Sequence, residues 1–272
     1  MLLGRIQRMV PARHSLYKGI QQQLVDRLSG NRVLFHHVPK CAGSSVYRQL
    51  IKSYVFSHRV LHVDPAYRAY ENMHEEADQK KVSEESQKFR EYLLLYYLHQ
   101  DIRCIAGHVR FSEPAYRLFC DRYTFVTTLR EPVAWFISWY FYNVTADEQR
   151  WKMAMPIDEF IETEQARHFG AGYAHFFSGL PVEADPHSAE AIERAKDNIG
   201  RMHIVGFVDD MPGLQAKLRQ RLGIKITIPH DNKARIDPLT RSKAITPAVI
   251  DKIRAISAAN LAVYDFARQR FG

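Results

Sequence analysis

The feature that most constrains the fold is a short apolar run that ends in a turn and leads into a helical pattern. The run Val33 to Val38 is predicted to be a buried strand, which Pro39 ends. Lys40 and Gly43 occupy the turn, and apolar residues at helical spacing follow at positions 46, 47, 50 and 51. Such a unit surrounds an anion with backbone N–H groups at the positive end of a helix dipole, and Lys40 adds a full charge. The spacing differs from the nucleoside-triphosphate loop, in which a lysine directly follows the last glycine.

The rest of the chain alternates β-rich runs with helical patterns. Further strands are expected at Ile102 to Ala106, Tyr123 to Leu129 and Ile204 to Val208. Helices are expected over residues 15–29, 83–99, 133–143, 157–165, 169–178, 187–199, 212–222 and 246–271, the last with a break near 257–259. This alternation predicts an α/β fold of three layers, with a central parallel sheet and helices on both faces. Ligands of such sheets bind beyond the carboxyl ends of the strands.

Length and composition favour one domain. With 272 residues and 46% apolar content, the chain can bury a sizeable core, and we expect a single domain over residues 1–272. Residues 1–30 are interpreted as an N-terminal helical extension. The polar segment 55–82 is interpreted as an excursion from the core, either a lid or a substrate-facing insert. Residues 228–243 are expected to form a polar, basic loop.

Charge and cysteine content exclude several classes of protein. The net charge of +8 is spread along the chain, which suits anion contacts in a cleft, and no basic run or recognition motif indicates a nucleic-acid partner. The three cysteines form no C-x-x-C pair, so neither a disulfide framework nor a structural zinc site is expected. No apolar stretch approaches the ~20 residues that span a bilayer, and no signal peptide is evident. We therefore expect a soluble, cytoplasmic protein.

A second motif follows the run at 123–129. Arg130 stands where this predicted strand ends, Pro132 begins a helix, and Ser138 lies two helical turns further on. An arginine fork and a hydroxyl on one rigid strand–helix unit can hold a second phosphate. Because the carboxyl ends of parallel strands lie at one edge, we expect this motif and the turn at Lys40 to face the same cleft.

Together these motifs resemble the PAPS-dependent sulfotransferases, which use 3′-phosphoadenosine 5′-phosphosulfate. The resemblance is to the carbohydrate branch that includes heparan sulfate 2-O-sulfotransferase-like enzymes. Residues 38–45 match the family's 5′-phosphosulfate loop, and Arg130 and Ser138 match its 3′-phosphate motif. Glu131 stands where the family usually has aspartate, and Trp135 where arginine is frequent. The resemblance covers about residues 31–271, without 55–82, and implies a sulfotransferase fold related to P-loop NTPases.

Two further stretches extend the resemblance. Gly107-His108 resembles the segment after the family's second core strand, where a catalytic histidine lies; Ala106 stands where a second histidine is common. Residues 229–235 resemble the family's basic loop over the nucleotide, and residues 256–266 resemble its last helix.

The resemblance implies a set of site residues. His108 would be the general base, because a near-neutral pKa suits that role, and Lys40 would neutralise the leaving phosphate. PAPS is the implied co-substrate, PAP the product, and no metal is expected. The implied nucleotide-binding residues are Lys40, Cys41, Ala42, Gly43, Ser44, Ser45, Arg130, Ser138, Asn232, Lys233 and Arg235. Cys41 is interpreted as a small turn residue and not a nucleophile, since no partner pattern supports catalysis.

Two alternatives stay open from the sequence. A non-catalytic module that binds PAP, another anion or a glycan would carry the same motifs without transfer. A kinase-like nucleotide enzyme is disfavoured, because the expected Gly-Lys-Ser/Thr and metal-binding aspartate are missing. The acceptor is expected to be a hydroxyl compound, either a glycan or a small molecule. The sequence determines neither its identity nor the oligomeric state.

Overall fold

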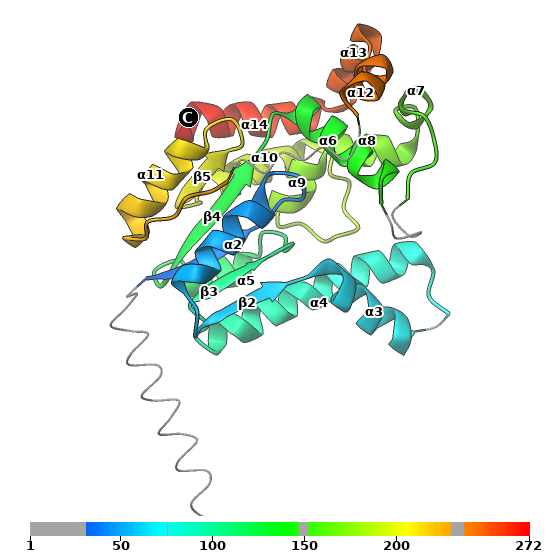
Figure 1. Cartoon of the computed structure of the whole chain (residues 1–272). Coiled ribbons are helices and arrows are strands. Elements are labelled where there is room, and N and C mark those ends of the chain that lie inside the picture. Colours follow the sequence, from blue (N-terminus) through cyan, green and yellow to red (C-terminus); the bar gives the residue numbers. More distant parts are fainter. Residues whose placement is uncertain (1–30, 75, 147–151, 230–236) are drawn as a thin grey trace, which may run out of the picture.

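The computed structural model describes residues 31–74, 76–146, 152–229 and 237–272. The predicted helix over 15–29 and the proposed extension 1–30 lie outside the described residues. Figure 1 shows a sheet between helices, with the C-terminus at the end of the last helix.

The described residues contain one five-stranded sheet in which every pair of neighbours is parallel. The strand order is β2-β3-β1-β4-β5. In the central register, Phe35 lies opposite Ala106 on one side and Val126 on the other. The strands are β1 (Arg32–His36), β2 (His58–Leu61), β3 (Cys104–Gly107), β4 (Tyr123–Leu129) and β5 (Ile204–Phe207). The predicted central parallel sheet is therefore confirmed.

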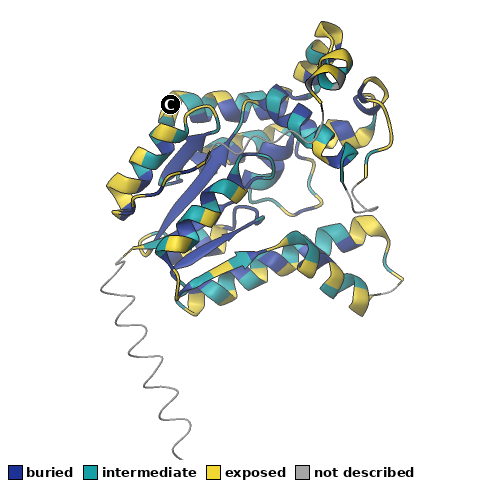
Figure 2. Cartoon of the chain, viewed as in Figure 1, coloured by how far each residue is buried: buried dark blue, intermediate teal, exposed yellow. Residues whose placement is uncertain are grey.

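Helices cover both faces of this sheet, which confirms the three-layer prediction. Alternate residues of β1 supply the two cores: Val33 and Phe35 pack with α2 and α11, while Leu34 packs with α4, α5, α9, α10 and α14. In Figure 2 the strands β1, β3, β4 and β5 are almost entirely buried, whereas β2 is partly exposed. The helices are α2 (Gly43–Ser53), α3 (Val63–Met73), α4 (Gln79–His99), α5 (Glu113–Phe119), α6 (Pro132–Val144), α7 (Ile157–Phe160), α8 (Glu164–Gly170), α9 (Gly172–Phe177), α10 (Ala189–Gly200), α11 (Met211–Leu222), α12 (Pro238–Ala244), α13 (Pro247–Ile256) and α14 (Ala258–Phe271).

A third apolar cluster extends the fold beside the sheet. It joins α6, α7, α8 and α13 through residues such as Phe136, Phe160 and Ile253. Figure 1 shows these helices gathered on one side of the molecule. Within the described ranges, no helix is long and apolar enough to cross a membrane.

The ends of several helices follow from local sequence signals. Thr246 accepts a hydrogen bond from the Val249 N–H at the start of α13, and Pro247 occupies the first turn. Gly223 ends α11 with φ of 65°, in the left-handed region that glycine adopts readily. The predicted break at 257–259 is confirmed, because α13 ends at Ile256 and α14 begins at Ala258.

Three predictions were wrong. The single helix expected over 157–165 is divided, because α7 ends at Phe160 and α8 begins at Glu164. The segment 55–82 is not wholly an excursion from the core, because His58–Leu61 forms the edge strand β2 and pairs with β3. An edge strand is covered less than a central one, so its polar residues concealed it in the sequence. Part of the predicted loop 228–243 is the helix α12, whose start is marked by Asp237, which accepts from the Leu239 N–H, and by Pro238. Whether the rest of 55–82 acts as a lid stays a prediction.

Candidate functional site

The turn between β1 and α2 has an unusual backbone. Lys40 and Ala42 have φ of 64° and 59°, a region that residues other than glycine seldom adopt. Ala42 is the N-cap residue of α2, its side chain makes no capping bond, and the first turn of the helix contains no acidic residue. The first N–H groups of a helix have no partner within it. This helix end therefore suits an external anion.

The β4–α6 unit fastens the turn through three consecutive carbonyl groups. The Trp135 Nε1–H donates to the Pro39 carbonyl at 2.6 Å, and the Thr128 hydroxyl donates to that of Cys41 at 2.7 Å. Between them, Arg130 Nη1 donates to the Lys40 carbonyl at 3.4 Å. In a trans peptide the C=O and N–H point in opposite directions. The N–H groups of residues 40 to 42 therefore point away from α6, and that of Cys41 donates to Val38.

Tyr173, on α9, locks the two motifs together, and sequence reasoning missed it. Its hydroxyl accepts from the Arg130 N–H at 3.0 Å, donates to the Arg130 carbonyl at 2.5 Å and contacts Cys41 Sγ at 3.7 Å. Burial raises the pKa of this phenol, so it stays protonated. No local motif marks Tyr173, because its partners are 43 and 132 positions away in sequence.

The Cys41 thiol is buried, and burial raises its pKa to about 12. A thiol in this state is not a nucleophile at neutral pH. This supports the interpretation of Cys41 as a small turn residue. Beyond it, Ser44 is exposed and Ser45 is half-buried in the first turn of α2.

Two histidine rings stack beside the turn. His108 follows β3, and its ring lies 4.0 Å from that of His37, centroid to centroid, at 30°. Gly43 makes room for this pair, because a Cβ there would lie 1.7 Å from His37 Cδ2. Sequence reasoning placed Gly43 in the anion loop but gave His37 no role. Its position directly after β1, at the carboxyl edge of the sheet, was the available signal.

Both rings are neutral at neutral pH. Burial lowers the pKa of His108 to about 4, with a further contribution from the positive charge of Arg90. The Arg90 Nε–H also donates to the His108 carbonyl at 2.9 Å. Burial likewise lowers the pKa of His37, followed by the effects of His108 and Lys40. The site therefore keeps two uncharged imidazoles close to cationic side chains.

One nitrogen of the His108 ring is unused within the described part of the fold. Nδ1 of His108 is buried and has no hydrogen-bond partner among the described residues. An interaction with the His37 backbone partly offsets the lowering of the His108 pKa.

The basic side chains of the two motifs lie at the same edge of the sheet. The Lys40 ammonium lies 3.6 Å from the centre of the Tyr142 ring, over α6. Burial lowers the pKa of Arg130, but an arginine stays charged at neutral pH. The contact between Arg130 and Lys40 joins residues 90 positions apart, as the parallel-sheet prediction required. Ser138 is half-buried two turns into α6. Asn232, Lys233 and Arg235 lie outside the described residues.

Two departures from the family pattern have structural uses here. The Glu131 carboxylate caps α6, since it accepts from the N–H groups of Val133 and Ala134 at 3.1 and 2.7 Å. Trp135 replaces a possible phosphate contact with the bond to the Pro39 carbonyl. These substitutions therefore stabilise the turn and the helix that follows Arg130.

The edge thus combines an uncapped helix end, two basic side chains and a neutral imidazole. Within the described ranges, no group of three His, Cys, Asp or Glu residues could hold a metal ion. No protein-family model matches the chain, and no curated protein matches it. The function is therefore inferred from the chemistry of this edge.

Proposed function

We propose that this chain is a sulfotransferase that moves a sulfuryl group from PAPS to a hydroxyl group of a carbohydrate. The observation that carries the proposal is the contact between Arg130 and the Lys40 carbonyl. It makes the two anion-binding motifs parts of one site, which suits a ligand with two separate anionic groups. The resemblance of both motifs to the sulfotransferase family supports the same ligand.

The residues present fit an anionic nucleotide. The N-terminal end of α2 has no side-chain cap and no acidic residue, so its N–H groups and the hydroxyls of Ser44 and Ser45 would hold the 5′-phosphate. Arg130 and Ser138 would hold the 3′-phosphate. When bound, PAPS supplies a sulfuryl group on a phosphate leaving group. Lys40 stabilises the negative charge that develops on that side of the site.

His108 is the proposed general base. Its neutral ring accepts the proton of the acceptor hydroxyl, and stacking on the His37 ring, 4.0 Å away between ring centres, holds it in place. A pKa of about 4 makes this imidazole fully unprotonated but weakly basic in the free protein. A bound anion adds negative charge that offsets the positive charges of Lys40 and Arg90. This raises the pKa of His108 toward the range in which a general base works.

The low pKa of His108 in the free protein also favours a second candidate, a module that binds PAP without transfer. A labelled-PAPS transfer assay against glycans and small hydroxyl compounds separates the two. The proposal predicts transfer to at least one sugar acceptor by the wild-type chain. Saturable PAP binding with no transfer to any acceptor would support the binding module. Absence of both binding and transfer would refute both candidates.

A further inference from the structure

A second concentration of basic side chains lies away from the proposed site. It surrounds an open cavity of about 650 Å³ at the amino end of β5, whose first residue, Ile204, forms part of the wall. The polar lining comes from the residue before β5, from α11 and from the end of α14, namely His203, Lys217, Gln220, Arg221 and Arg270. Ile204 and Phe271 provide apolar surface between them. The cavity therefore lies at the opposite edge of the sheet from Lys40 and His108.

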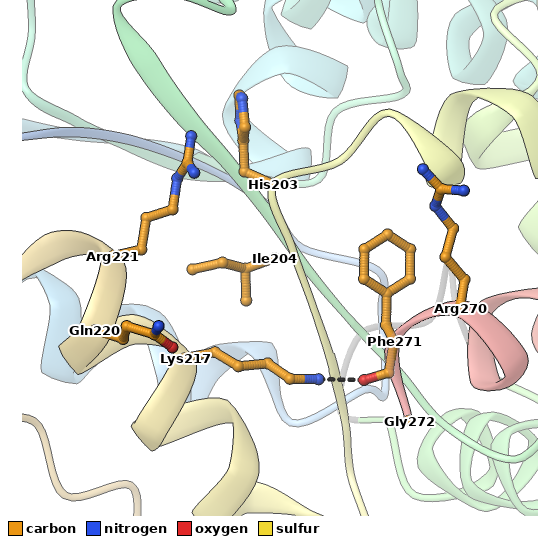
Figure 3. Close-up of a pocket in the computed structure, with 8 residues that line it drawn as sticks. All are labelled: His203, Ile204, Lys217, Gln220, Arg221, Arg270, Phe271 and Gly272. Carbon is orange, nitrogen blue, oxygen red and sulfur yellow. Dashed lines mark hydrogen bonds between the residues drawn. The ribbon is translucent and has the colours of Figure 1, made fainter.

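Every ionisable side chain that lines this cavity is basic. Figure 3 shows Arg221 and Arg270 on either side of the cavity, where both extend toward the same end as the His203 ring. They come from different helices, α11 and α14, so the tertiary fold places them at opposite walls of the same cavity. Among the described residues that line the cavity, none is an aspartate or a glutamate.

The His203 ring presents a donor. Its Nδ1 lies 2.9 Å from the Phe125 backbone nitrogen and accepts that N–H. In a neutral imidazole the other nitrogen then carries the proton, so Nε2–H is a donor. Burial and the nearby Arg221 lower the pKa of His203, against the opposing effect of Asp121. The ring is thus a neutral donor among positive charges.

Gly272 also lines the cavity, and no aspartate or glutamate side chain among the described residues forms an ion pair with its arginines. The Lys217 ammonium donates to two backbone carbonyls, of Val205 at 3.3 Å and of Phe271. Neither Arg221 nor Arg270 forms an ion pair with any described residue. By contrast Arg268, one half-turn before Arg270 on the same helix, pairs with Asp209. Arg268 therefore forms an ion pair within the fold, whereas Arg221 and Arg270 form none with the described residues and are available to an anionic ligand.

We propose that this cavity binds a small anion that carries a phosphate or sulfate group. The guanidinium groups of Arg221 and Arg270 donate two hydrogen bonds each in a fork that matches a tetrahedral oxyanion. His203 Nε2–H and the Lys217 ammonium supply further donors, and Ile204 and Phe271 accommodate an apolar part of the ligand. The inference does not rest on the proposed sulfotransferase function, because the two sites share no residue.

The test is an NMR titration of the full chain with inorganic pyrophosphate at constant ionic strength. The chain carries Arg130→Ala, which weakens anion binding at the other edge. We expect saturable shifts of the His203 ring and of the Arg221 and Arg270 Nε–H signals. Adding Arg221→Gln with Arg270→Gln should weaken binding by about tenfold or more, since two charge-assisted forks are lost. Both side chains are exposed, so this variant keeps the fold.

Arg254→Gln is the matched control, because Arg254 is exposed and pairs with Asp251 away from the cavity. It should leave the dissociation constant unchanged. A double variant that binds as tightly as the control would overturn the proposal. A parallel titration with a sulfated monosaccharide distinguishes the source of the anion. Binding of either probe supports the site and identifies its class, whereas binding of neither refutes it.

Discussion

The two ends of the three central strands treat positive charge in opposite ways. At the amino end, Arg32 binds Asp101 through two hydrogen bonds of 2.7 and 2.5 Å, and Arg122 binds the same carboxylate at 2.6 Å. At the carboxyl end, Arg130 donates to a backbone carbonyl and the Lys40 ammonium lies over the Tyr142 ring. The same strands, β1, β3 and β4, lead to both sets.

This difference distinguishes arginines that a carboxylate neutralises from one that a carbonyl holds. A carboxylate between Arg32 and Arg122 cancels much of their positive charge, whereas the Lys40 carbonyl leaves most of the charge of Arg130 in place. The neutral histidines at the carboxyl end fit the same description, since burial and neighbouring cations keep them unprotonated.

The first prediction concerns the base. His108→Ala should lower sulfuryl transfer by about 10²- to 10⁴-fold, the usual range for a lost general base. PAP binding should remain, because the anion contacts of Lys40 and Arg130 are intact. Turnover and equilibrium binding are measured on the same preparation. His99→Ala, an exposed histidine at the end of α4, is the control. Unchanged turnover would remove His108 from the mechanism.

The second prediction concerns the acid sensitivity of the carboxyl end. His36 lies between Phe111 and Phe125 in the core, and burial lowers its pKa to about 4. The unfolded chain takes up a proton near pH 6.5, while the folded one does not until about pH 4. This group's contribution is therefore fully present above pH 6.5 and is lost as the pH falls.

His36→Phe should remove that dependence. Between pH 7 and pH 4, the unfolding free energy of the variant should fall by about 3 kcal/mol less than that of the wild type. Urea unfolding at several pH values measures this difference. Parallel curves for the two proteins would mean that His36 does not carry the acid sensitivity.

The third prediction asks whether Arg130 is reserved for a ligand. Arg130→Ala should weaken PAP by about 10- to 100-fold, the value of a charge-assisted bidentate contact, and should weaken nucleotides without a 3′-phosphate much less. Calorimetric titration with both nucleotides measures the ratio. Arg254→Ala serves as the exposed control. Equal weakening of both nucleotides argues against a 3′-phosphate contact.

The fourth prediction tests the amino end. Asp101→Asn should cost about 1 kcal/mol or less of unfolding free energy, because the pairs it breaks are partly exposed. It should leave PAP binding and transfer unchanged. Chemical denaturation and the transfer assay measure the two effects, with Asp251→Asn as a control at another exposed pair. A clear loss of transfer would show that the two ends are not independent.

Most of the fold could be predicted because its signals are local. The runs that became β1, β3, β4 and β5 are rich in apolar and β-branched residues, and β3, β4 and β5 are fully buried in the structure. The strand β2 escaped prediction because an edge position leaves His58 and Arg59 outside the core. Asp237 and Pro238 are residue types typical of a helix start and could have predicted α12. The basic composition of the region favoured a loop instead.

The candidate site was only half predictable. The turn, Gly43 and Arg130 were predicted because a tight turn and a strand end restrict which residue types occur next to them in the sequence. His37, Tyr173 and the second use of Trp135 were missed, since each acts through a partner distant in sequence. No spacing rule connects Tyr173 with Arg130, and only the packing of α9 against the sheet brings them together.

The sequence alone determined where the strands end and which residues stand there, because β-formers, prolines and helix starts act over a few residues. It also determined that basic side chains follow two of the central strands. The pairing of Arg32 with Asp101 and the neutral state of His37 and His108 follow only from the tertiary structure. Pairing and protonation depend on burial and on charges brought together from separate parts of the chain. The low dielectric constant of a buried site strengthens these electrostatic effects.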